Sequence, residues 1–296
     1  MANSYTDENG VYRNKPGFTH ADQLSKYEYE VVAARSREIL AGKIDLGIKE
    51  HSLKRLSAIH EHLFKDVYDW AGKLRTVPSS KRADSGTVSR FAEADKIVEN
   101  WQELEKKATG FVSAAVSSLG QRSESLAEIF IEANRIHAFP EGNGRSLQVF
   151  MKELAKEQYV ELDYTKITPD AWNRASAISG MHGRFFEHIH FIQSPSDAEP
   201  MQQIFAIMAR DSRARAVETL SQEQACAKFP ELRPAYVGLR LIEDRAGESF
   251  GGDAQRVSSY MHEVRLAFVK RLNQGESVTQ ALSPANDQSR SPHRER

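Results

Sequence analysis

The sequence has one cysteine, Cys226, among its 296 residues. A single thiol excludes an intramolecular disulfide and suits a reducing compartment. No apolar run reaches the ~18 residues that a membrane-spanning helix needs, and the first residues lack the charged-then-apolar pattern of a signal peptide. We therefore expect a cytoplasmic protein with no membrane partner. The net charge of −1 gives no indication of a nucleic-acid partner.

Metal-binding clusters are also missing from the sequence, which contains no C-x-x-C pair and no His-rich tract. The composition is otherwise ordinary for a globular protein, with 40% hydrophobic and 27% charged residues. A polar stretch flanked by prolines, Ser194 to Pro200, predicts a domain boundary. We expect a main domain over 1–195, a helical appendix of unknown role over 201–282 and a disordered polar tail over 283–296.

Apolar residues at helical spacing recur through the main domain and predict several helices. The clearest patterns cover residues 53–70, 91–107 and 123–136, and another follows residue 147. Further helices are predicted from Thr168 through residue 189 and, in the appendix, over 201–219 and 256–272. Tyr164 and Trp172 could flank a nucleobase, but a core position is at least as good an interpretation of each.

Between two of these helical patterns lies the densest group of chemical side chains, His137-Ala-Phe-Pro-Glu-Gly-Asn-Gly-Arg-Ser-Leu-Gln148. Gly142 and Gly144 allow positive φ, so successive N–H groups there can form an anion-binding nest at the start of a helix. The helix dipole and the planar donors of Arg145 suit phosphate oxygens. Glu141 could hold Mg²⁺, which needs only one or two carboxylates beside phosphate oxygens. His137 could accept a proton from a nucleophile.

A plainer interpretation exists for each of these residues taken alone. A glycine-rich turn between helices is usually a C-cap, and a histidine on an apolar face is usually a core residue. Their order, however, resembles the signature of Fic domains, His-x-Phe-x-(Asp/Glu)-Gly-Asn-Gly-Arg-x-x-Arg, at every fixed position except the last. Gln148 stands where that family has its second arginine.

The resemblance covers roughly residues 5–195 and implies an all-α fold, a Fic-like helical bundle that carries one small β-hairpin flap. It also implies a role for each matching position. His137 would deprotonate a target hydroxyl, Phe139 would anchor the loop, and Glu141 would hold Mg²⁺. The groups that bind the nucleotide phosphates would be Gly142, Asn143, Gly144 and Arg145, with Gln148 in place of the arginine that grips the γ-phosphate and pairs with an inhibitory glutamate. Gln148 thus departs from both the usual ATP pose and the usual inhibition.

A second segment resembles the β-hairpin flap of Fic domains. The run Trp70-Ala-Gly-x-x-Arg75 leads into an alternating stretch, 74–77, which predicts a short strand, and Pro78 to Lys81 predict a turn. The edge of such a strand can hold an extended peptide by main-chain hydrogen bonds, so Thr76 and Val77 are the expected docking residues. Lys81 is expected to contact the nucleotide.

The function that the resemblance implies is transfer of AMP from ATP to a Ser, Thr or Tyr hydroxyl of a target protein, in a toxin-like or effector-like role. One alternative is a different diphosphate-containing donor, because Gln148 brings no charge. Another is a dormant binding module, against which the intact His137 and Glu141 argue. A small antitoxin-like inhibitor and delivery to another cell by a secretion or conjugation system are further expectations.

Overall fold

The computed structural model describes residues 4–82, 86–186 and 190–282. Within these residues, no helix is both long and apolar enough to cross a membrane. The polar tail expected over 283–296 lies outside the described residues.

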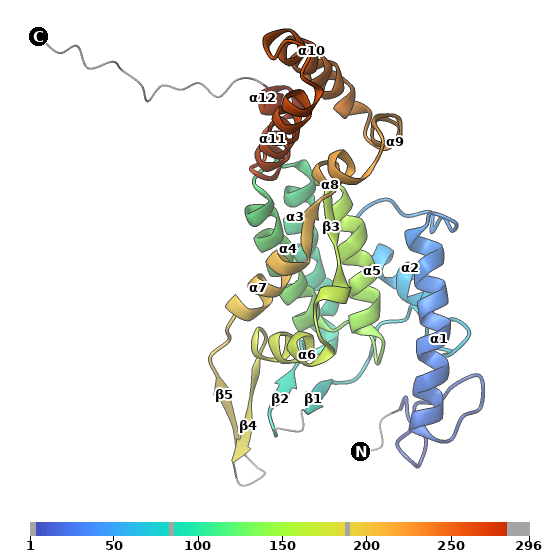
Figure 1. Ribbon diagram of the computed structural model, residues 1–296. Helices are drawn as coiled ribbons and strands as arrows, with labels where there is room; N and C mark the ends of the chain where they lie inside the picture. Colours follow the sequence, from blue (N-terminus) through green and yellow to red (C-terminus); the bar gives the residue numbers. More distant parts are fainter. Residues whose placement is uncertain (1–3, 83–85, 187–189, 283–296) are drawn as a thin grey trace, which may run out of the picture. The chain divides into compact units, whose positions relative to one another are not determined.

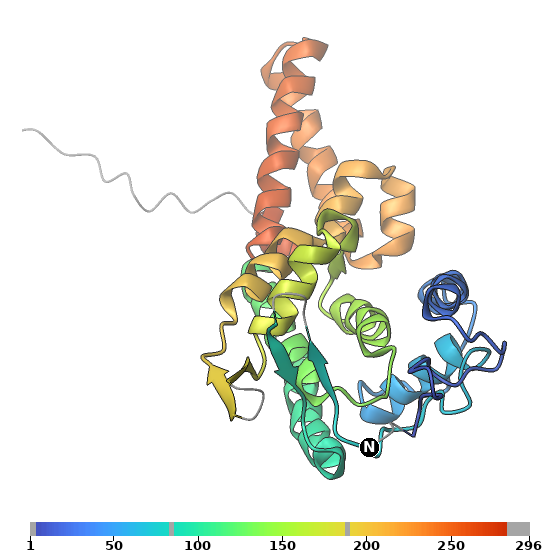
Figure 2. The same ribbon diagram turned by 90° about the horizontal axis from the view of Figure 1, so that it is seen from below.

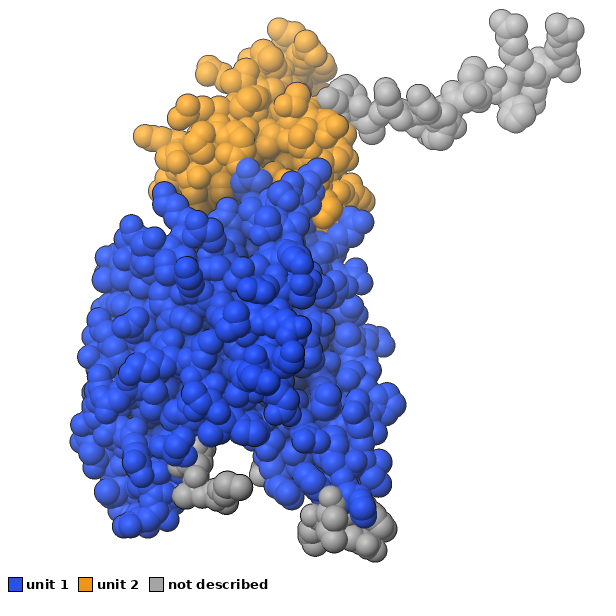
Figure 3. Space-filling model, turned by 180° about the vertical axis from the view of Figure 1, so that it is seen from behind, with its two compact units in different colours: residues 1–115, 120–209 blue, residues 116–119, 210–296 orange. Residues whose placement is uncertain are grey.

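The chain divides into two compact units, which Figure 3 colours separately. The first unit contains residues 1–115 and 120–209, and the second contains residues 116–119 and 210–296. The boundary expected near residue 200 therefore falls inside the first unit. The helix that follows this point belongs to the first unit because its Phe205 packs against Phe130, with 5.7 Å between ring centroids.

The first unit is mainly helical, as the apolar spacing predicts. Its helices are α1 (Ala21–Leu40), α2 (Leu53–Phe64), α3 (Ile97–Ser113), α4 (Leu119–Ile136), α5 (Asn143–Lys156), α6 (Pro169–Ile178) and α7 (Glu199–Met208), with 3₁₀ turns at Ala94–Lys96 and Tyr164–Lys166. Helices α1, α2 and α5 pack against one another, as Figures 1 and 2 show. The predicted apolar face of α5 is buried, with Phe150, Met151 and Leu154 fully enclosed.

The strands of the first unit form a larger sheet than a two-stranded flap. They are β1 (Ser80–Arg82), β2 (Val88–Arg90), β4 (His182–Phe186) and β5 (His190–Ser194), and the short strand β3 (Val160–Leu162) lies outside this sheet. Strand β6 (Ala209–Asp211) starts at the last residue of the first unit, and its other two residues belong to the second unit. The order β1-β2-β4-β5 is antiparallel throughout, with Lys81 opposite Ser89 and Phe185 opposite Phe191. Strand β1 is therefore one edge of the sheet (Figure 1).

The strand predicted over 74–77 is wrong, because the flap strands begin at Ser80. The backbone of this stretch bonds to other partners. The N–H of Arg75 donates to the Ala138 carbonyl at 2.9 Å, and the N–H of Thr76 donates to the Tyr5 hydroxyl at 3.0 Å. The Val77 carbonyl accepts from the Arg75 side chain at 2.8 Å. These groups are not available for a sheet ladder.

The helical prediction that extends through residue 189 is also wrong beyond the end of α6 at Ile178, because β4 and β5 form an antiparallel hairpin there. The backbones approach closely at Gly183, where a Cβ atom would lie 2.1 Å from the Ile192 carbonyl oxygen. A glycine is thus required in that strand. Two residues of the predicted apolar face, His188 and Ile189, lie outside the described residues.

Two predicted helices are shorter than expected. The helix predicted over 53–70 ends at Phe64, and residues 68–70 add an aromatic turn in which Tyr68 stacks on Trp70 at 4.2 Å. The helix predicted over 201–219 is divided into two helices by β6.

The second unit is a small helical bundle with its own core. Its helices are α8 (Ser212–Thr219), α9 (Gln222–Lys228), α10 (Arg233–Ser249), α11 (Ala254–Asn273) and α12 (Val278–Leu282), with a 3₁₀ turn at Pro230–Leu232. Leu232, Leu239, Phe268 and Leu272 are among its buried residues. The helix predicted over 256–272 is confirmed as α11.

Candidate active site

The signature residues form the tight connection between α4 and α5. Asn143 closes this loop, because its side-chain oxygen accepts from the Phe139 N–H at 2.9 Å and its side-chain nitrogen donates to the Phe139 carbonyl at 2.7 Å. Phe139 is fully buried, as expected for an anchor. Both polar atoms of the Asn143 side chain are thus used to close the loop.

Gly142 occupies a position that only glycine fits. Its φ is 81°, in the left-handed region, and an added Cβ would lie 2.4 Å and 2.5 Å from ring carbons of Phe64 and 3.1 Å from His60 Nε2. Gly142 is also the N-cap of α5, and it has no side chain to cap the helix. No side chain at the N-cap therefore competes for the first N–H groups of α5, which is the condition that an anion site at a helix start needs.

His60 of α2 supports the loop through both of its ring nitrogens. Its sequence pattern indicated only a buried position. Its Nδ1 accepts from the Gly72 N–H at 2.9 Å, so its Nε2 carries the proton and donates to the Glu141 carbonyl at 2.9 Å. The ring stacks on Phe139, with centroids 3.9 Å apart. Burial lowers the pKa of His60 to about 3, which keeps this donor and acceptor arrangement intact.

His137 follows the last residue of α4 and adopts a left-handed backbone conformation, with φ at 51°. Such a conformation costs a non-glycine residue about 1–2 kcal/mol. The imidazole stacks face to face on Phe91, with centroids 3.6 Å apart and planes 7° from parallel. Its Nδ1 atom is buried. Burial lowers the pKa of His137 to about 3, and the positive charges of Arg75 and Lys81 lower it further.

Arg145, the expected phosphate ligand, is held by two carboxylates in this structure. Its Nη2 lies 3.1 Å from Glu141 Oε1, and its Nη1 forms an ion pair with Glu28 of α1. The guanidinium also lies over the Phe64 ring, 5.0 Å from its centroid. A bound phosphate would therefore share or replace these carboxylates as the partner of Arg145.

Glu28 is a site residue that the sequence pattern did not indicate. Its side chain is buried, with 5% of its surface exposed, although it lies on α1 more than a hundred residues before the loop. It accepts a hydrogen bond from the Tyr68 hydroxyl, and burial together with Glu28 raises the pKa of that hydroxyl. Tyr12 also reaches the loop, donating from its hydroxyl to the Pro140 carbonyl at 3.1 Å. These contacts connect the loop to the N-terminal part of the chain.

Glu141 is the only carboxylate of the signature, and its surroundings are compatible with a magnesium ion. Its Oε1 accepts from the Gly142 N–H at 2.9 Å, and the side chain is 43% exposed. No group of three or more metal-binding side chains occurs among the described residues. Because Mg²⁺ can take its remaining oxygens from phosphates and water, one carboxylate beside an anion site is sufficient.

Of the residues predicted to form the flap, Lys81 lies on a flap strand, whereas Thr76 and Val77 do not. Lys81 lies exposed on β1, and its charge acts on the His137 imidazole. Thr76 and Val77 lie before β1, and the Thr76 N–H and the Val77 carbonyl are bonded within the protein. Gln148 lies on α5 one turn after Arg145 and is partly exposed. Tyr164 and Trp172 are packed edge to face at 5.2 Å, beside Phe130 and Phe205.

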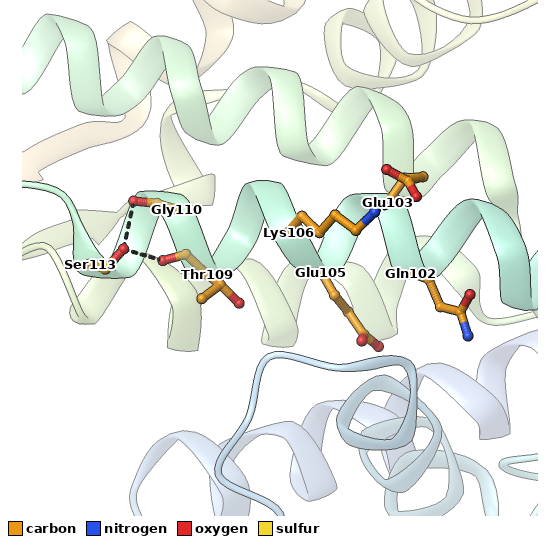
Figure 4. A pocket seen from close by; sticks show the side chains of 7 residues that line it. All are labelled: Gln102, Glu103, Glu105, Lys106, Thr109, Gly110 and Ser113. Atoms are coloured by element: carbon orange, nitrogen blue, oxygen red, sulfur yellow. Dashed lines mark hydrogen bonds and ion pairs between the residues drawn. The ribbon is translucent and has the colours of Figure 1, made fainter.

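A surface depression on α3 is not part of this site. It has a volume of about 700 Å³, and none of the signature residues lines it. Figure 4 shows its side chains, which all come from one face of α3. Lys106 pairs with Glu103 at 2.7 Å, and the Ser113 hydroxyl donates to the Thr109 carbonyl at 2.9 Å. These polar groups are thus paired within α3 itself, and the depression is open to solvent.

Comparison with known proteins gives consistent results. The model of the Fic/DOC family matches residues 50–155. The chain is 31% identical over 172 residues to "Probable protein adenylyltransferase Fic" of Salmonella typhimurium, covering 58% of this chain and 80% of that protein. It is 32% identical over 177 residues to "Protein adenylyltransferase VbhT" of Bartonella schoenbuchensis, covering 58% of this chain. The matched region there is only 34% of the relative's length.

Solved structures show the same fold. The N-terminal Fic domain of a Bartonella quintana protein with bound ADP superposes with a TM-score of 0.58 at 21% identity, covering 70% of this chain and 94% of that chain. The BepC protein of Bartonella tribocorum with bound AMPPNP gives a TM-score of 0.56 at 20% identity, covering 70% and 95%.

Proposed function

The chain belongs to the Fic/DOC family, and from this premise we propose that it is an adenylyltransferase that moves AMP from ATP to a Ser, Thr or Tyr hydroxyl of a target protein. One observation carries the proposal most directly. A partly buried imidazole, His137, stands at one end of a loop whose other end is the uncapped N-terminus of α5. The proposed proton acceptor and the helix start proposed to bind the phosphates are thus five residues apart in the chain, at His137 and Gly142.

The chemistry of this arrangement can be written as a single displacement. The target hydroxyl gives its proton to His137, and its oxygen bonds to the α-phosphorus of ATP. The bond from that phosphorus to the oxygen bridging to the β-phosphorus breaks, and pyrophosphate leaves. Because Nδ1 is buried, Nε2 is the nitrogen left to accept the proton. The low pKa of His137 keeps the ring neutral before reaction, and the negative phosphates would raise that pKa toward the working pH.

The phosphates would bind to the start of α5. The N–H of Gly142 is already bonded to Glu141, so the backbone N–H groups of Asn143, Gly144 and Arg145 are the expected donors. Glu141 would hold Mg²⁺, which would neutralise part of the charge on the leaving group. Lys81 is placed on β1 to contribute a further positive charge.

Strand β1 is the docking edge that we propose for the target. The sequence favoured Thr76 and Val77, but the Thr76 N–H and the Val77 carbonyl already have partners inside the protein. Residues 80–82 are exposed and form the outer strand of the sheet, so an extended peptide could add to this edge. Main-chain pairing of this kind would align a hydroxyl with His137 and read little sequence.

Two finer points belong to the same proposal. Gln148 favours a donor other than ATP as the second candidate, because a neutral amide makes a weaker bond to a γ-phosphate than arginine does. Several structural neighbours are named as VirB-translocated effector proteins, which supports an effector-like role with a target in another cell. We also propose a small antitoxin-like inhibitor. Such an inhibitor would act on Arg145, which pairs with two carboxylates in this structure.

Replacing His137 with Ala tests the assignment. Incubation with radioactive ATP and a candidate target should show labelling by the wild type and about 10²–10⁴-fold slower labelling by the variant. ATP binding by calorimetry and the circular-dichroism spectrum should be unchanged. Labelling at the wild-type rate would exclude His137 as the base, and loss of the folded spectrum would indicate a core histidine.

A further inference from the structure

Arg75 is a buried arginine whose side chain donates to several main-chain carbonyls. It is 2% exposed, and among the ion pairs of the described residues none includes it. Its Nε donates to the His137 carbonyl at 2.7 Å, and its Nη1 donates to the Val77 carbonyl at 2.8 Å. Its Nη2 donates to the carbonyls of Ala92 and, at 3.2 Å, Ile136. One guanidinium thus joins four points of the backbone.

Two of these carbonyls belong to the end of α4. The last carbonyls of a helix have no intrahelical partner and carry the negative end of the helix dipole, so a buried cation there is favourable. Most left-handed residues at such a helix end are glycines, but here the residue is His137. Arg75 satisfies the His137 carbonyl directly, and its own N–H donates to the next carbonyl, that of Ala138, at 2.9 Å.

The other two carbonyls lie on either side of the flap hairpin. Val77 precedes β1, and Ala92 follows β2. The Ala92 N–H also donates to the Arg135 carbonyl of α4 at 3.0 Å, and Phe91 stacks on the His137 ring. Arg75 therefore bonds to both ends of the hairpin and to His137, the proposed base.

We propose that Arg75 is a positioning residue that fixes the His137 imidazole relative to the docking edge of the flap. This inference rests on the proposed function. Arg75 acts through His137 and the flap and does not touch nucleotide or target. Only a planar guanidinium can reach four carbonyls in different directions, because an ammonium offers three donors at one point. A displacement of about 1 Å between reacting groups can cost about 10²-fold in rate.

The test compares Arg75→Lys and Arg75→Gln with a matched control. Arg122 is equally buried and donates to the Gln158 carbonyl at 2.6 Å, but it lies at the start of α4, away from the signature loop. Arg122→Lys should therefore alter stability without altering transfer by the folded protein. We expect both Arg75 variants to lower kcat by about 10²-fold while the Kd for ATP stays within about threefold, since the start of α5 is untouched.

A second readout does not depend on activity. The Phe91 ring shifts the proton resonances of the stacked His137 imidazole, so the NMR signals assigned with a His137→Gln control report the position of the ring. They should move toward unstacked values in both Arg75 variants and stay in place in Arg122→Lys. This comparison remains valid if the wild type transfers no nucleotide, which would refute the proposed function alone.

Several outcomes would overturn the inference. These are an unchanged kcat in Arg75→Lys, a loss of kcat equal to that of Arg122→Lys, or His137 signals that do not move. Failure of both Arg75 variants to fold while Arg122→Lys folds would assign Arg75 to the stability of the fold and would equally overturn a positioning role.

Discussion

Alanine at either glycine of the signature should affect a different property of the protein. Gly142→Ala should lower the free energy of unfolding, and Gly144→Ala should weaken ATP binding. At Gly142 an alanine would adopt a left-handed conformation, which costs about 1–2 kcal/mol. Its Cβ would also lie 2.4 Å from a Phe64 ring carbon, and such overpacking costs about 1–3 kcal/mol. The sum, about 2–5 kcal/mol, is a large part of the 5–15 kcal/mol that typically holds a domain folded.

Gly144 is the matched control. It lies two residues further along the chain, has no positive φ, and has open space where a Cβ would be placed. Gly144→Ala should therefore change the free energy of unfolding by less than about 1 kcal/mol. Because its Cβ would lie at the start of α5, where a phosphate must approach the backbone, this variant should instead bind ATP more weakly.

Both variants can be measured by denaturant unfolding followed by tryptophan fluorescence. All three tryptophans lie in the first unit, so the signal reports the unit that contains the site. Gly142→Ala should unfold at clearly lower denaturant than the wild type, and Gly144→Ala at nearly the same concentration. Equal midpoints for the wild type and Gly142→Ala would refute the steric argument, and a large loss in Gly144→Ala would show that the two glycines are not distinct in role.

Three further predictions concern other residues of the loop and α5. Asn143→Ala should lower the free energy of unfolding by about 2–4 kcal/mol, since it leaves the buried N–H and carbonyl of Phe139 without partners; a urea titration measures it. The acid limb of kcat/KM should lie below pH 6.5, because the folded protein keeps His137 neutral down toward its pKa of about 3; a limb at or above 6.5 contradicts this. Gln148→Arg should tighten ATP binding by about tenfold and leave ADP binding unchanged, as calorimetry can establish. Equal gains for both nucleotides would argue against a γ-phosphate contact.

The sequence predicted the local parts of this site well. The spacing of apolar residues identified α4 and α5, and the glycines between them marked a turn opening a helix. Burial of Phe139 also follows from its place in the resemblance. Such features depend on residues close together in the chain, where propensity and backbone geometry act directly.

The distant residues that support the loop could not be predicted from local sequence patterns. Glu28, His60 and Arg75 reach it from 60 to more than 100 residues away, through contacts that leave no periodic trace in the sequence. Arg75 lies inside a pattern typical of a strand, but the N–H groups of Arg75 and Thr76 bond to the Ala138 carbonyl and the Tyr5 hydroxyl instead. Alternation of residue types describes one face of a segment and does not reveal which partner its backbone will bind.

The prediction of a helix where β4 and β5 form a hairpin was wrong for a related reason. Apolar residues near Phe185 fit both a helical and an extended spacing over so short a run. Pairing with β2 decides between them, and a β-sheet contact across more than 90 residues is a tertiary property. The same holds for the unit boundary, which depends on Phe205 packing against Phe130 and not on the prolines that precede it.

The proposed reaction delivers AMP, and not a terminal phosphate, to a protein hydroxyl. Parallel reactions with ATP labelled at the α-phosphate and at the γ-phosphate, followed by mass spectrometry of the target, test it most directly. Label should enter the target from the α position only, with the added mass of one AMP on a Ser, Thr or Tyr residue, and should be absent with His137→Ala. Label from the γ position, or no modification of any hydroxyl with active wild-type protein and magnesium, would contradict it.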